Sequence, residues 1–293
     1  MNELYRVIGI SKQAVHQWLN RILLKYEEQE QLLPIIRQLR EDHPRLGCRQ
    51  MYDMLNPRHM GRDYFERFCF EEGLKVVIKG KKYKTTDSRG VIRFPNLLLE
   101  LEELSGVNQL WVSDITYFDL AGRVYYITFI LDIFNREIVG YSLSKTLKTL
   151  DTSLKALQMG LENRKIEKGC GIIFHSDGGG QYYSKEFLSV TRQYGIKNSM
   201  GKTAYENPHA ERINGTIKND YLIPYQPENF EELNNMLKKA VTLYNTQRPH
   251  QSLQGHTPQR FSRLVDDGLL TKVWVVNKRK KETKKEKVNI IIK

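Results

Sequence analysis

The spacing of hydrophobic and polar positions changes near residue 108, and this change divides the chain into a helical part and a part that contains strands. Before it, apolar residues recur at helical spacing in LPIIRQLREDHPRLGCRQMYDMLN and in GRDYFERFCFEEGL. Pro44 and Gly47 should end the first of these helices, and Arg49 should lie on an exposed face at the start of the next. The pattern therefore predicts an all-helical N-terminal region.

Upstream of these helices, LYRVIGISKQAVHQWL has the outline of a helix-turn-helix, with Gly9 between two short apolar segments. Ser11 can cap the second segment, where the apolar spacing predicts that Val15, Trp18 and Leu19 face inward. Because only a few residues precede Gly9, a short packing hairpin explains the pattern nearly as well as a DNA-reading motif does.

Beyond residue 108, the segment QLWVSDITYF alternates in the manner of a β-strand. Val112, Asp114 and Thr116 share one face of this strand, and the residues between them share the other. The next segment, RVYYITFILDIFNREIVGYSLS, predicts two strands that reverse near Asn135. These three strands should pair antiparallel.

The remainder of this part alternates helix and strand. We expect a helix over roughly 148–163, a strand in GCGIIFHSD, a helix in SKEFLSVTRQYG that ends at Gly195, and a strand in IKNSM. The inward stripe of the first helix consists of Leu150, Leu154, Leu157 and Leu161. The order predicts an α/β fold, with a mixed five-stranded sheet and helices on both faces.

A later helix should run from about Glu231 and end within YNTQRPH. Its inward residues would be Leu233, Met236, Leu237, Ala240 and Leu243. Arg248 and His250 would then lie at the exit of this helix, where Arg248 can bind phosphate or cap the helix.

Charge and cysteine content narrow the possible partners of this 293-residue chain. Its net charge is +12, and the tail at 278–293 holds eight basic and two acidic residues. Such a tail attracts polyanions such as nucleic acid, although a solvated end without a partner explains the tail alone equally well.

The three cysteines lack zinc-knuckle spacing, and the sequence has no signal peptide and no apolar run of bilayer length. These features predict a protein of a reducing cytoplasm, with no membrane partner.

Three acidic residues occupy positions that call for an explanation. Asp114 and Asp177 lie on or just after apolar strands, where a carboxylate is costly unless a cation meets it. Glu211 lies on a helix that Asn207 can cap, with Pro208 at its first position. The polar face of this helix consists of Asn207, Glu211, Asn214 and Lys218, and the opposing apolar face of Ala210, Ile213, Ile217 and Tyr221. The helix can therefore pack on the sheet and still present Glu211 toward it.

Three carboxylates without a cysteine ligand pattern suit a hard metal ion such as Mg2+ or Mn2+. Two such ions about 4 Å apart can hold a phosphodiester and stabilise both the attacking and the leaving oxygen. Asp177 would then be a metal ligand, and the glycines after it would let backbone and DNA approach closely.

Each acid also has a purely structural explanation. Asp114 can pair with a buried Lys or Arg, Asp177 can initiate the turn before the glycines, and Glu211 gains from its helix dipole. Taken together, these separate explanations account for the three acids less well than one shared site does. Other polar residues nearby fit structural roles better: His175 as a hydrogen-bonding neighbour, and Asp119 and Asp132 as residues of hairpin turns.

Four motifs in sequence order, WVSDITY, HSDGGGQY, YENPHAERINGTIKNDYL and YNTQRPHQSLQGHTP, extend over roughly residues 107–262. They resemble the integrase core of insertion-sequence-three transposases, the OrfB-type enzymes with a DDE triad. The upstream DHPRLGCRQMYDML and TTDSRG are similar to that family's helical module and linker. The resemblance implies an RNase H-like fold, with Asp114, Asp177 and Glu211 as catalytic metal ligands for two ions of Mg2+ or Mn2+.

The chain departs from the family pattern between Asp177 and Glu211, where 33 residues are two fewer than is usual. The shortening falls in MGKTAYEN, before the helix, so we expect an altered loop rather than an altered triad, with Glu206 as the fallback third ligand. The chain also lacks the His-His-Cys-Cys zinc module of retroviral integrases.

The resemblance divides the chain into five expected regions. They are a helical DNA-binding region of helix-turn-helix type at 1–75, a basic linker at 76–105, an RNase H-like catalytic core at 106–222, its helical extension at 223–265, and a short strand with a Lys-rich tail at 266–293.

The activity that the resemblance implies is metal-dependent 3′-end cleavage and strand transfer on double-stranded DNA, at the element's terminal inverted repeats and in the target. It implies a homo-oligomer on DNA at the bacterial nucleoid, with a possible upstream-frame partner or fusion. Alternatives are a catalytically retired copy acting as a DNA-binding repressor or inhibitor, and a plain RNase H-type nuclease. The residues expected to contact DNA are Lys218, Asn207, Arg212, Asn214, His175, Arg248, His250 and Arg49.

Overall fold

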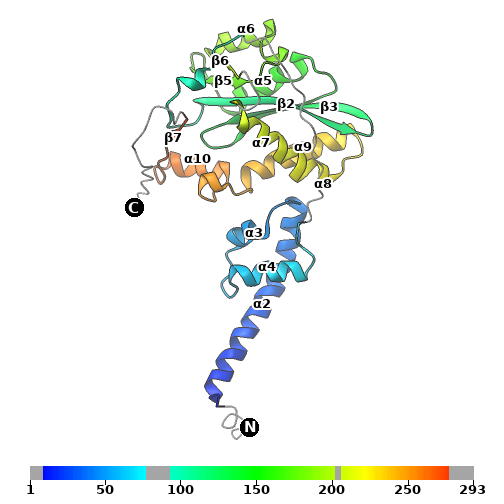
Figure 1. The fold of residues 1–293 in the computed structure, drawn as a ribbon, viewed down its shortest axis with the longest axis vertical. Helices are drawn as coiled ribbons and strands as arrows, with labels where there is room; N and C mark the ends of the chain where they lie inside the picture. The colour runs from blue at the N-terminus through cyan, green and yellow to red at the C-terminus, as the bar shows by residue number, and fades with distance from the viewer. Residues whose placement is uncertain (1–8, 77–92, 202–205, 277–293) are drawn as a thin grey trace. The chain divides into compact units, whose positions relative to one another are not determined.

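The structure, a computed structural model, describes residues 9–76, 93–201 and 206–276 (Figure 1). Several predictions concern residues outside these ranges: the helix before Gly9, most of the basic linker, the middle of MGKTAYEN and the Lys-rich tail. The chain forms two compact units, each with a hydrophobic core of its own.

The described part of the first unit, which spans residues 1–80, is helical as the sequence predicts. Its described helices are α2 (Lys12–Asp42), α3 (Cys48–Leu55) and α4 (Arg62–Glu71). The C-terminal half of α2 packs against α3 and α4 through a core that includes Ile36, Met51 and Phe65. Side chains of all three helices therefore form this small core.

The turn that follows α2 is held by one arginine side chain. The Arg40 guanidinium donates to the carbonyl oxygens of Pro44, Leu46 and Leu74, at 3.1, 2.7 and 2.8 Å. These bonds satisfy two backbone carbonyls of the turn between α2 and α3 and one that follows α4. The break that Pro44 and Gly47 predict is confirmed, since α2 ends at Asp42 and α3 begins after Gly47.

The start of α2 confirms one prediction and corrects another. Ser11 caps the helix as expected, accepting a hydrogen bond from the Ala14 N–H at 3.1 Å. The expectation that Val15, Trp18 and Leu19 face inward is wrong: Trp18 is 57% and Leu19 42% exposed, and Val15 is half-buried. The helix continues through Pro34 to Asp42, and the core of this unit packs against its C-terminal half. No described segment therefore covers the first turns of the helix.

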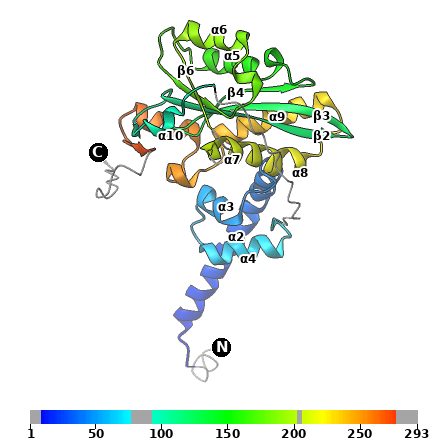
Figure 2. The ribbon, with the colours of Figure 1, turned by 45° about the horizontal axis from the view of Figure 1, so that its top comes forward.

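The second unit, residues 81–293, contains a mixed five-stranded sheet in the order β4-β3-β2-β5-β6 (Figure 2). Its strands are β2 (Leu110–Leu120), β3 (Arg123–Asp132), β4 (Ile138–Ser144), β5 (Ile173–Ser176) and β6 (Lys197–Met200). The first three pair antiparallel, and β5 pairs parallel with both β2 and β6. The predicted mixed sheet is confirmed, and its strand types are those of an RNase H-like fold.

Helices cover both faces of this sheet. One face packs against α5 (Ser153–Asn163) and α6 (Lys185–Tyr194), and the other against α7 (Pro208–Ile217) and α9 (Phe230–Thr246). Along β2, Trp111 enters the core beneath α5 and α6, whereas Val112 enters the core beneath α7 and α9. Asp114 follows Val112 by two positions and therefore faces α7.

One predicted position in the first of these helices is wrong. Leu154, Leu157 and Leu161 are buried as expected, but Leu150 is 61% exposed. It lies in a short 3-10 turn, η2 (Thr149–Asp151), and the non-helical backbone of Thr152, with φ −116° and ψ −101°, separates that turn from α5. The break moves Leu150 out of the apolar stripe.

The remaining described elements are helices, helical turns and two short strands, some before α7 and some after it. The remaining elements are η5 (Lys218–Leu222, a π-helical turn), α8 (Ile223–Tyr225), η6 (Gln251–Leu253), α10 (Pro258–Asp266), η1 (Leu97–Leu99), η3 (Gly180–Tyr182) and the strands β1 (Glu103–Leu104) and β7 (Trp274–Val275). β1 and β7 pair antiparallel with each other. In α9 the predicted inward residues Leu233, Leu237 and Ala240 are fully buried. No helix among the described residues is both long and apolar enough to cross a bilayer.

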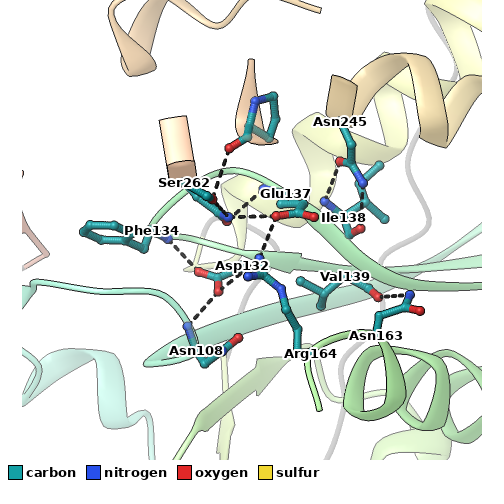
Figure 3. Close-up of polar contacts among 12 residues, drawn as sticks. Asn108, Asp132, Phe134, Glu137, Ile138, Val139, Asn163, Arg164, Asn245 and Ser262 are labelled. Carbon is teal, nitrogen blue, oxygen red and sulfur yellow. Dashed lines mark hydrogen bonds and ion pairs between the residues drawn. The ribbon is translucent and has the colours of Figure 1, made fainter. Parts of the chain in front are cut away.

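The hairpin between β3 and β4 carries a buried polar network (Figure 3). Asp132 is 0% exposed and accepts hydrogen bonds from the N–H groups of Asn108 and Phe134, at 2.7 and 2.9 Å. Arg164 lies 3.8 Å from Asp132 and 2.8 Å from Glu137. Asp132 therefore belongs to a hairpin turn, as predicted, and Arg164, shared with Glu137, is its ion-pair partner.

Candidate active site

Asp114 and Asp177 occupy equivalent positions on neighbouring parallel strands. The register of β2 and β5 pairs Val112 with His175 and Ser113 with Ser176. One further residue along each strand brings Asp114 beside Asp177, which follows directly after the end of β5. The topology thus brings together two acids that are far apart in the sequence.

Asp114 is half-buried, and each of its two carboxylate oxygens accepts one hydrogen bond. Its Oδ1 accepts from the Ile115 N–H at 2.8 Å, and its Oδ2 accepts from Nδ2 of Asn214 at 2.8 Å. Burial raises the pKa of Asp114 to about 7, with further rises from the negative charges of Asp177 and Glu211, against the two hydrogen bonds. Among the described residues, no lysine, arginine or histidine forms an ion pair with any of these three acids.

Asp177 begins a tight turn, which was the structural alternative for this residue. Its Oδ1 accepts a hydrogen bond from the Gly179 N–H at 3.1 Å, and burial raises the pKa of its carboxyl group. A Cβ atom on Gly179 would lie 3.0 Å from the same Oδ1. At this position the glycine therefore leaves room for the carboxylate itself.

The helix α7 lies along β2 with its polar face toward the strand. Nδ2 of Asn207 donates to the Ser113 carbonyl at 2.9 Å, and Nζ of Lys218 donates to the Tyr117 carbonyl at 2.8 Å. Asn207 is the N-cap residue of α7 and Pro208 its first residue, as predicted, but the Asn207 side chain makes no capping hydrogen bond. The predicted apolar face is confirmed, since Ala210, Ile213, Ile217 and Tyr221 are at most 2% exposed.

Glu211 is exposed on the same helix, and its charge raises the pKa of Asp114. Glu206, the fallback third ligand, accepts a hydrogen bond from Nδ2 of Asn96 at 2.7 Å. The structure therefore links Glu211, through its charge, to Asp114.

The donor set fits a hard divalent cation, because carboxylate oxygens are the ligands that Mg2+ and Mn2+ prefer. The crowding of negative charge at Asp114 favours a cation on electrostatic grounds as well. Within the part of the chain that the structure describes, no three His, Cys, Asp or Glu side chains converge as a complete metal site. The predicted ligand triad thus stays a prediction.

Two family models match the sheet-containing unit. Both are described as integrase core domains, and they match residues 105–205 and 192–258. The transposase of insertion sequence element IS629 from Shigella sonnei is 32% identical to this chain, over 74% of the chain and 73% of the relative. The chain belongs to the insertion-sequence transposases with an integrase core. It is a DDE-type polynucleotidyl transferase, and its fold is RNase H-like.

Other relatives of the transposase are similar over much of its length. The 31 kDa protein of insertion element IS600 from Shigella sonnei is 29% identical over 87% of this chain and 96% of the relative. The transposase of IS904 from Lactococcus lactis is 30% identical over 62% of this chain and 72% of the relative. Membership of the insertion-sequence-three family in particular stays a prediction.

Solved integrase structures are similar at a lower level. The magnesium-bound catalytic core domain of HTLV-2 integrase, in its trimeric form, matches with a TM-score of 0.44 and 24% identity, over 54% of the transposase and 97% of that chain. A simian T-cell lymphotropic virus intasome, in complex with the PP2A regulatory subunit B56 gamma, matches with a TM-score of 0.48 and 18% identity, over 72% of the transposase and 66% of that chain.

The residues expected to contact DNA have differing surroundings in the transposase. Arg212 is exposed on α7, next to Glu211. Lys218 lies with its Nζ 4.6 Å from the centre of the Tyr117 ring. His175 is fully buried and shares a hydrogen bond of 2.9 Å with the Ser199 hydroxyl, and burial lowers its pKa to about 4.

The other predicted DNA contacts are engaged in bonds within the chain. Arg248 forms an ion pair of 2.8 Å with Asp220, and His250 packs edge-on against Tyr244. Arg49 in the first unit pairs with Glu66 at 2.7 Å, with 70% of its side chain exposed. Asn207 and Asn214 are buried against β2. Contacts of these residues with DNA stay predictions.

Sequence reasoning missed two residues of this region, Ser113 and Tyr182. The Tyr182 hydroxyl lies 2.9 Å from Oγ of Ser113, and both side chains are buried on the face opposite α7. The one available signal was a polar side chain directly before Asp114, on a face that is otherwise apolar.

Proposed function

We propose that the transposase cuts DNA at the ends of its element and joins the exposed 3′-hydroxyl to another phosphodiester, with Asp114, Asp177 and Glu211 holding divalent metal. The observation that supports this best is the raised pKa of Asp114, to which burial and the charges of Asp177 and Glu211 contribute. Crowded carboxylates without an ion-pair partner among the described residues favour a metal ion. Two bound ions of Mg2+ or Mn2+ would supply positive charge to the attacking and leaving oxygens.

The side chains of α7 would hold the acids and grip the substrate. Asn214 donates to Oδ2 of Asp114 at 2.8 Å and so restrains that carboxylate from one side. Arg212 is exposed beside Glu211, and Lys218 lies two turns further along the same polar face. These two cations would contact DNA phosphates near the reacting bond, which positions the strand without reading its sequence.

The remaining regions would supply affinity for the element's ends. In the first unit, Arg49 exposes most of its side chain at the start of α3 and would contact DNA through the helical region at 1–75. Arg248 and His250 follow α9, and the Lys-rich tail would add affinity that falls with salt. We propose that several copies assemble on DNA at the nucleoid, since two element ends must be brought together.

Incubation with DNA that carries the element's ends, with and without Mg2+, tests this proposal. A transposase nicks at the ends and joins strands only with Mg2+, whereas a retired repressor binds without cutting, and a plain nuclease cuts without joining. Asp114→Asn, Asp177→Asn and Glu211→Gln should each abolish both steps, and Asp119→Asn in the neighbouring hairpin is the matched control. Full activity of the three variants would contradict the assignment.

A further inference from the structure

Ser113, directly before Asp114, is hydrogen-bonded to segments that carry the other two acids. Its hydroxyl contacts Tyr182, in the loop after Asp177, and its carbonyl contacts Asn207, one turn before Glu211. Resting on the proposed function, we propose that Ser113 and Tyr182 are positioning residues that set the spacing of the three carboxylates and thereby the metal affinity of the site.

The hydroxyl bonds of Ser113 have a defined direction. Oγ of Ser113 donates to the Phe129 carbonyl on β3 at 2.8 Å, which uses its only hydrogen. The Tyr182 hydroxyl, 2.9 Å away, therefore donates to Ser113. Ser113 is 0% and Tyr182 2% exposed, so water does not compete for these bonds. A buried bond of this kind fixes the geometry of both partners.

From Tyr182 the connection continues to Asp177 through the backbone. The Tyr182 N–H donates to the Gly179 carbonyl at 3.0 Å, and the Gly179 N–H donates to Oδ1 of Asp177 at 3.1 Å. The tyrosine ring packs against Phe174 and Phe187, with ring centres 6.0 and 5.7 Å away. Because the ring is held by the core, its hydroxyl ties the turn of Asp177 to β2.

On the other face of β2, the Ser113 carbonyl holds the helix that carries Glu211. Nδ2 of Asn207 donates to this carbonyl at 2.9 Å, and the Asn207 carbonyl accepts from the Glu211 N–H at 3.3 Å. One turn after Glu211, Asn214 donates to Asp114 at 2.8 Å. Glu211 is thus bracketed by two bonds from α7 to β2.

Residues that orient metal ligands, without touching the metal, control metal affinity. Loss of such a partner typically lowers affinity by about 10- to 100-fold. Removing the Tyr182 hydroxyl would release the turn of Asp177 while leaving Asp114, Asp177 and Glu211 in place. We therefore expect weaker metal binding, and a higher Mg2+ requirement, from a substitution that changes no ligand.

The test compares Tyr182→Phe, Ser113→Ala and Ser113→Thr with Ser142→Ala in the full-length transposase. Ser142 is a matched control, because it is a buried serine of the same sheet whose hydroxyl donates to a backbone carbonyl, that of Thr152, at 2.9 Å. Mn2+ binding is measured directly by electron paramagnetic resonance, and DNA nicking is titrated with Mg2+. Circular dichroism confirms that each variant is folded.

Tyr182→Phe and Ser113→Ala should weaken Mn2+ binding by about tenfold or more and raise the Mg2+ concentration for half-maximal nicking in parallel. Ser113→Thr, which keeps a hydroxyl, should recover much of the loss, and Ser142→Ala should match the wild type in both measurements. If the first two variants bind Mn2+ as Ser142→Ala does, the positioning role is wrong. If the wild type itself neither binds Mn2+ nor nicks DNA, the proposed function fails instead.

Discussion

Two aspartates on neighbouring strands, the half-buried Asp114 on β2 and the buried Asp132 on β3, have different surroundings. Asp132 accepts two backbone hydrogen bonds, from Asn108 and Phe134, and lies 3.8 Å from Arg164. Asp114 has the charges of Asp177 and Glu211 as its neighbours. The chain thus places a cation, Arg164, which Glu137 shares, beside Asp132, whereas the charged neighbours of Asp114 are both acids.

The electrostatics of the two sites show what this difference means. Burial raises the pKa of both carboxyl groups. At Asp132 the Asn108 N–H, Arg164 and the Phe134 N–H oppose the rise, and the charge of Glu137 adds to it. At Asp114 the charges of Asp177 and Glu211 add to the rise, and among the described residues only two hydrogen bonds, from the Ile115 N–H and Asn214, oppose it, with no cation among the causes. A fold does not gain stability from crowding like charges, so the absence of a cation at Asp114 within the described chain supports its proposed role as a metal ligand, whereas Arg164 gives Asp132 a partner within the fold.

The largest contrast should appear in activity. Asp114→Asn should lower strand cleavage and joining by roughly 1000-fold or more, since it removes a proposed metal ligand at the point of charge development. Its free energy of unfolding without metal should be equal to or above that of the wild type, because a crowded negative charge is removed. Cleavage assays and urea unfolding measure the two quantities, and a large loss of stability would show that Asp114 is a structural residue.

The opposite result is expected for Asp132. Asp132→Ala leaves Arg164 without this partner and two buried N–H groups without their acceptor, and should lower the free energy of unfolding by about 3–5 kcal/mol. Urea unfolding measures this loss. Any cleavage by the folded fraction should keep the wild-type Mg2+ requirement, and a raised requirement would connect Asp132 to the active site.

Metal should stabilise the folded transposase through the proposed ligand Asp114 and not through the hairpin residue Asp119. At a Mn2+ concentration 100-fold above its dissociation constant, the wild type should gain about 2.7 kcal/mol. Asp114→Asn should lose most of this gain, whereas a variant of the hairpin aspartate, Asp119→Asn, should keep it. Thermal unfolding with and without Mn2+ measures the difference, and an equal gain in all three proteins would mean that metal binds elsewhere.

The sequence predicts features of Asp114 and Asp132 that depend on neighbouring residues in the chain, and not those that depend on distant segments. Alternation along β2 predicted that Val112 and Asp114 share a face, because burial on a strand depends on parity alone. The same local signal could not foresee that Arg164 would meet Asp132, or that Tyr182 would reach Ser113. Such pairs depend on how distant segments pack.

The errors have the same origin. Trp18 and Leu19 have the spacing of buried residues, but burial also needs a segment to cover them, and none of the described ones does so. Asn207 occupies the N-cap position, but its side chain donates through Nδ2 to a carbonyl of β2 and makes no capping hydrogen bond. Local propensity therefore predicted the elements well and the partners of single side chains poorly.

A smaller effect is expected at His250. Nearby cations disfavour the protonated form of His250, just as nearby acids disfavour the ionised form of Asp114. Burial, followed by the charges of Arg248 and Arg136, lowers the pKa of His250 to about 4. A group whose pKa falls on folding contributes stability above its unfolded pKa, near 6.5, which is lost as pH falls toward 4. His250→Gln should flatten this loss by roughly 1 kcal/mol in urea unfolding between pH 7 and pH 4.5. An unchanged pH profile would mean that His250 is protonated in the folded state.

The smallest effect is expected at Asp119, which lies on the same strand as Asp114 and makes a third point of comparison. It is exposed, and its Oδ1 accepts a hydrogen bond from the Gly122 N–H at 3.2 Å in the β2–β3 hairpin. Water can replace this bond, so Asp119→Ala should cost about 0.5–1 kcal/mol and leave cleavage unchanged. Urea unfolding and cleavage measured on one preparation would check both values. A loss of cleavage at this position would mean that an acid on β2 matters through its general charge, and the contrast between Asp114 and Asp132 would then no longer locate the active site.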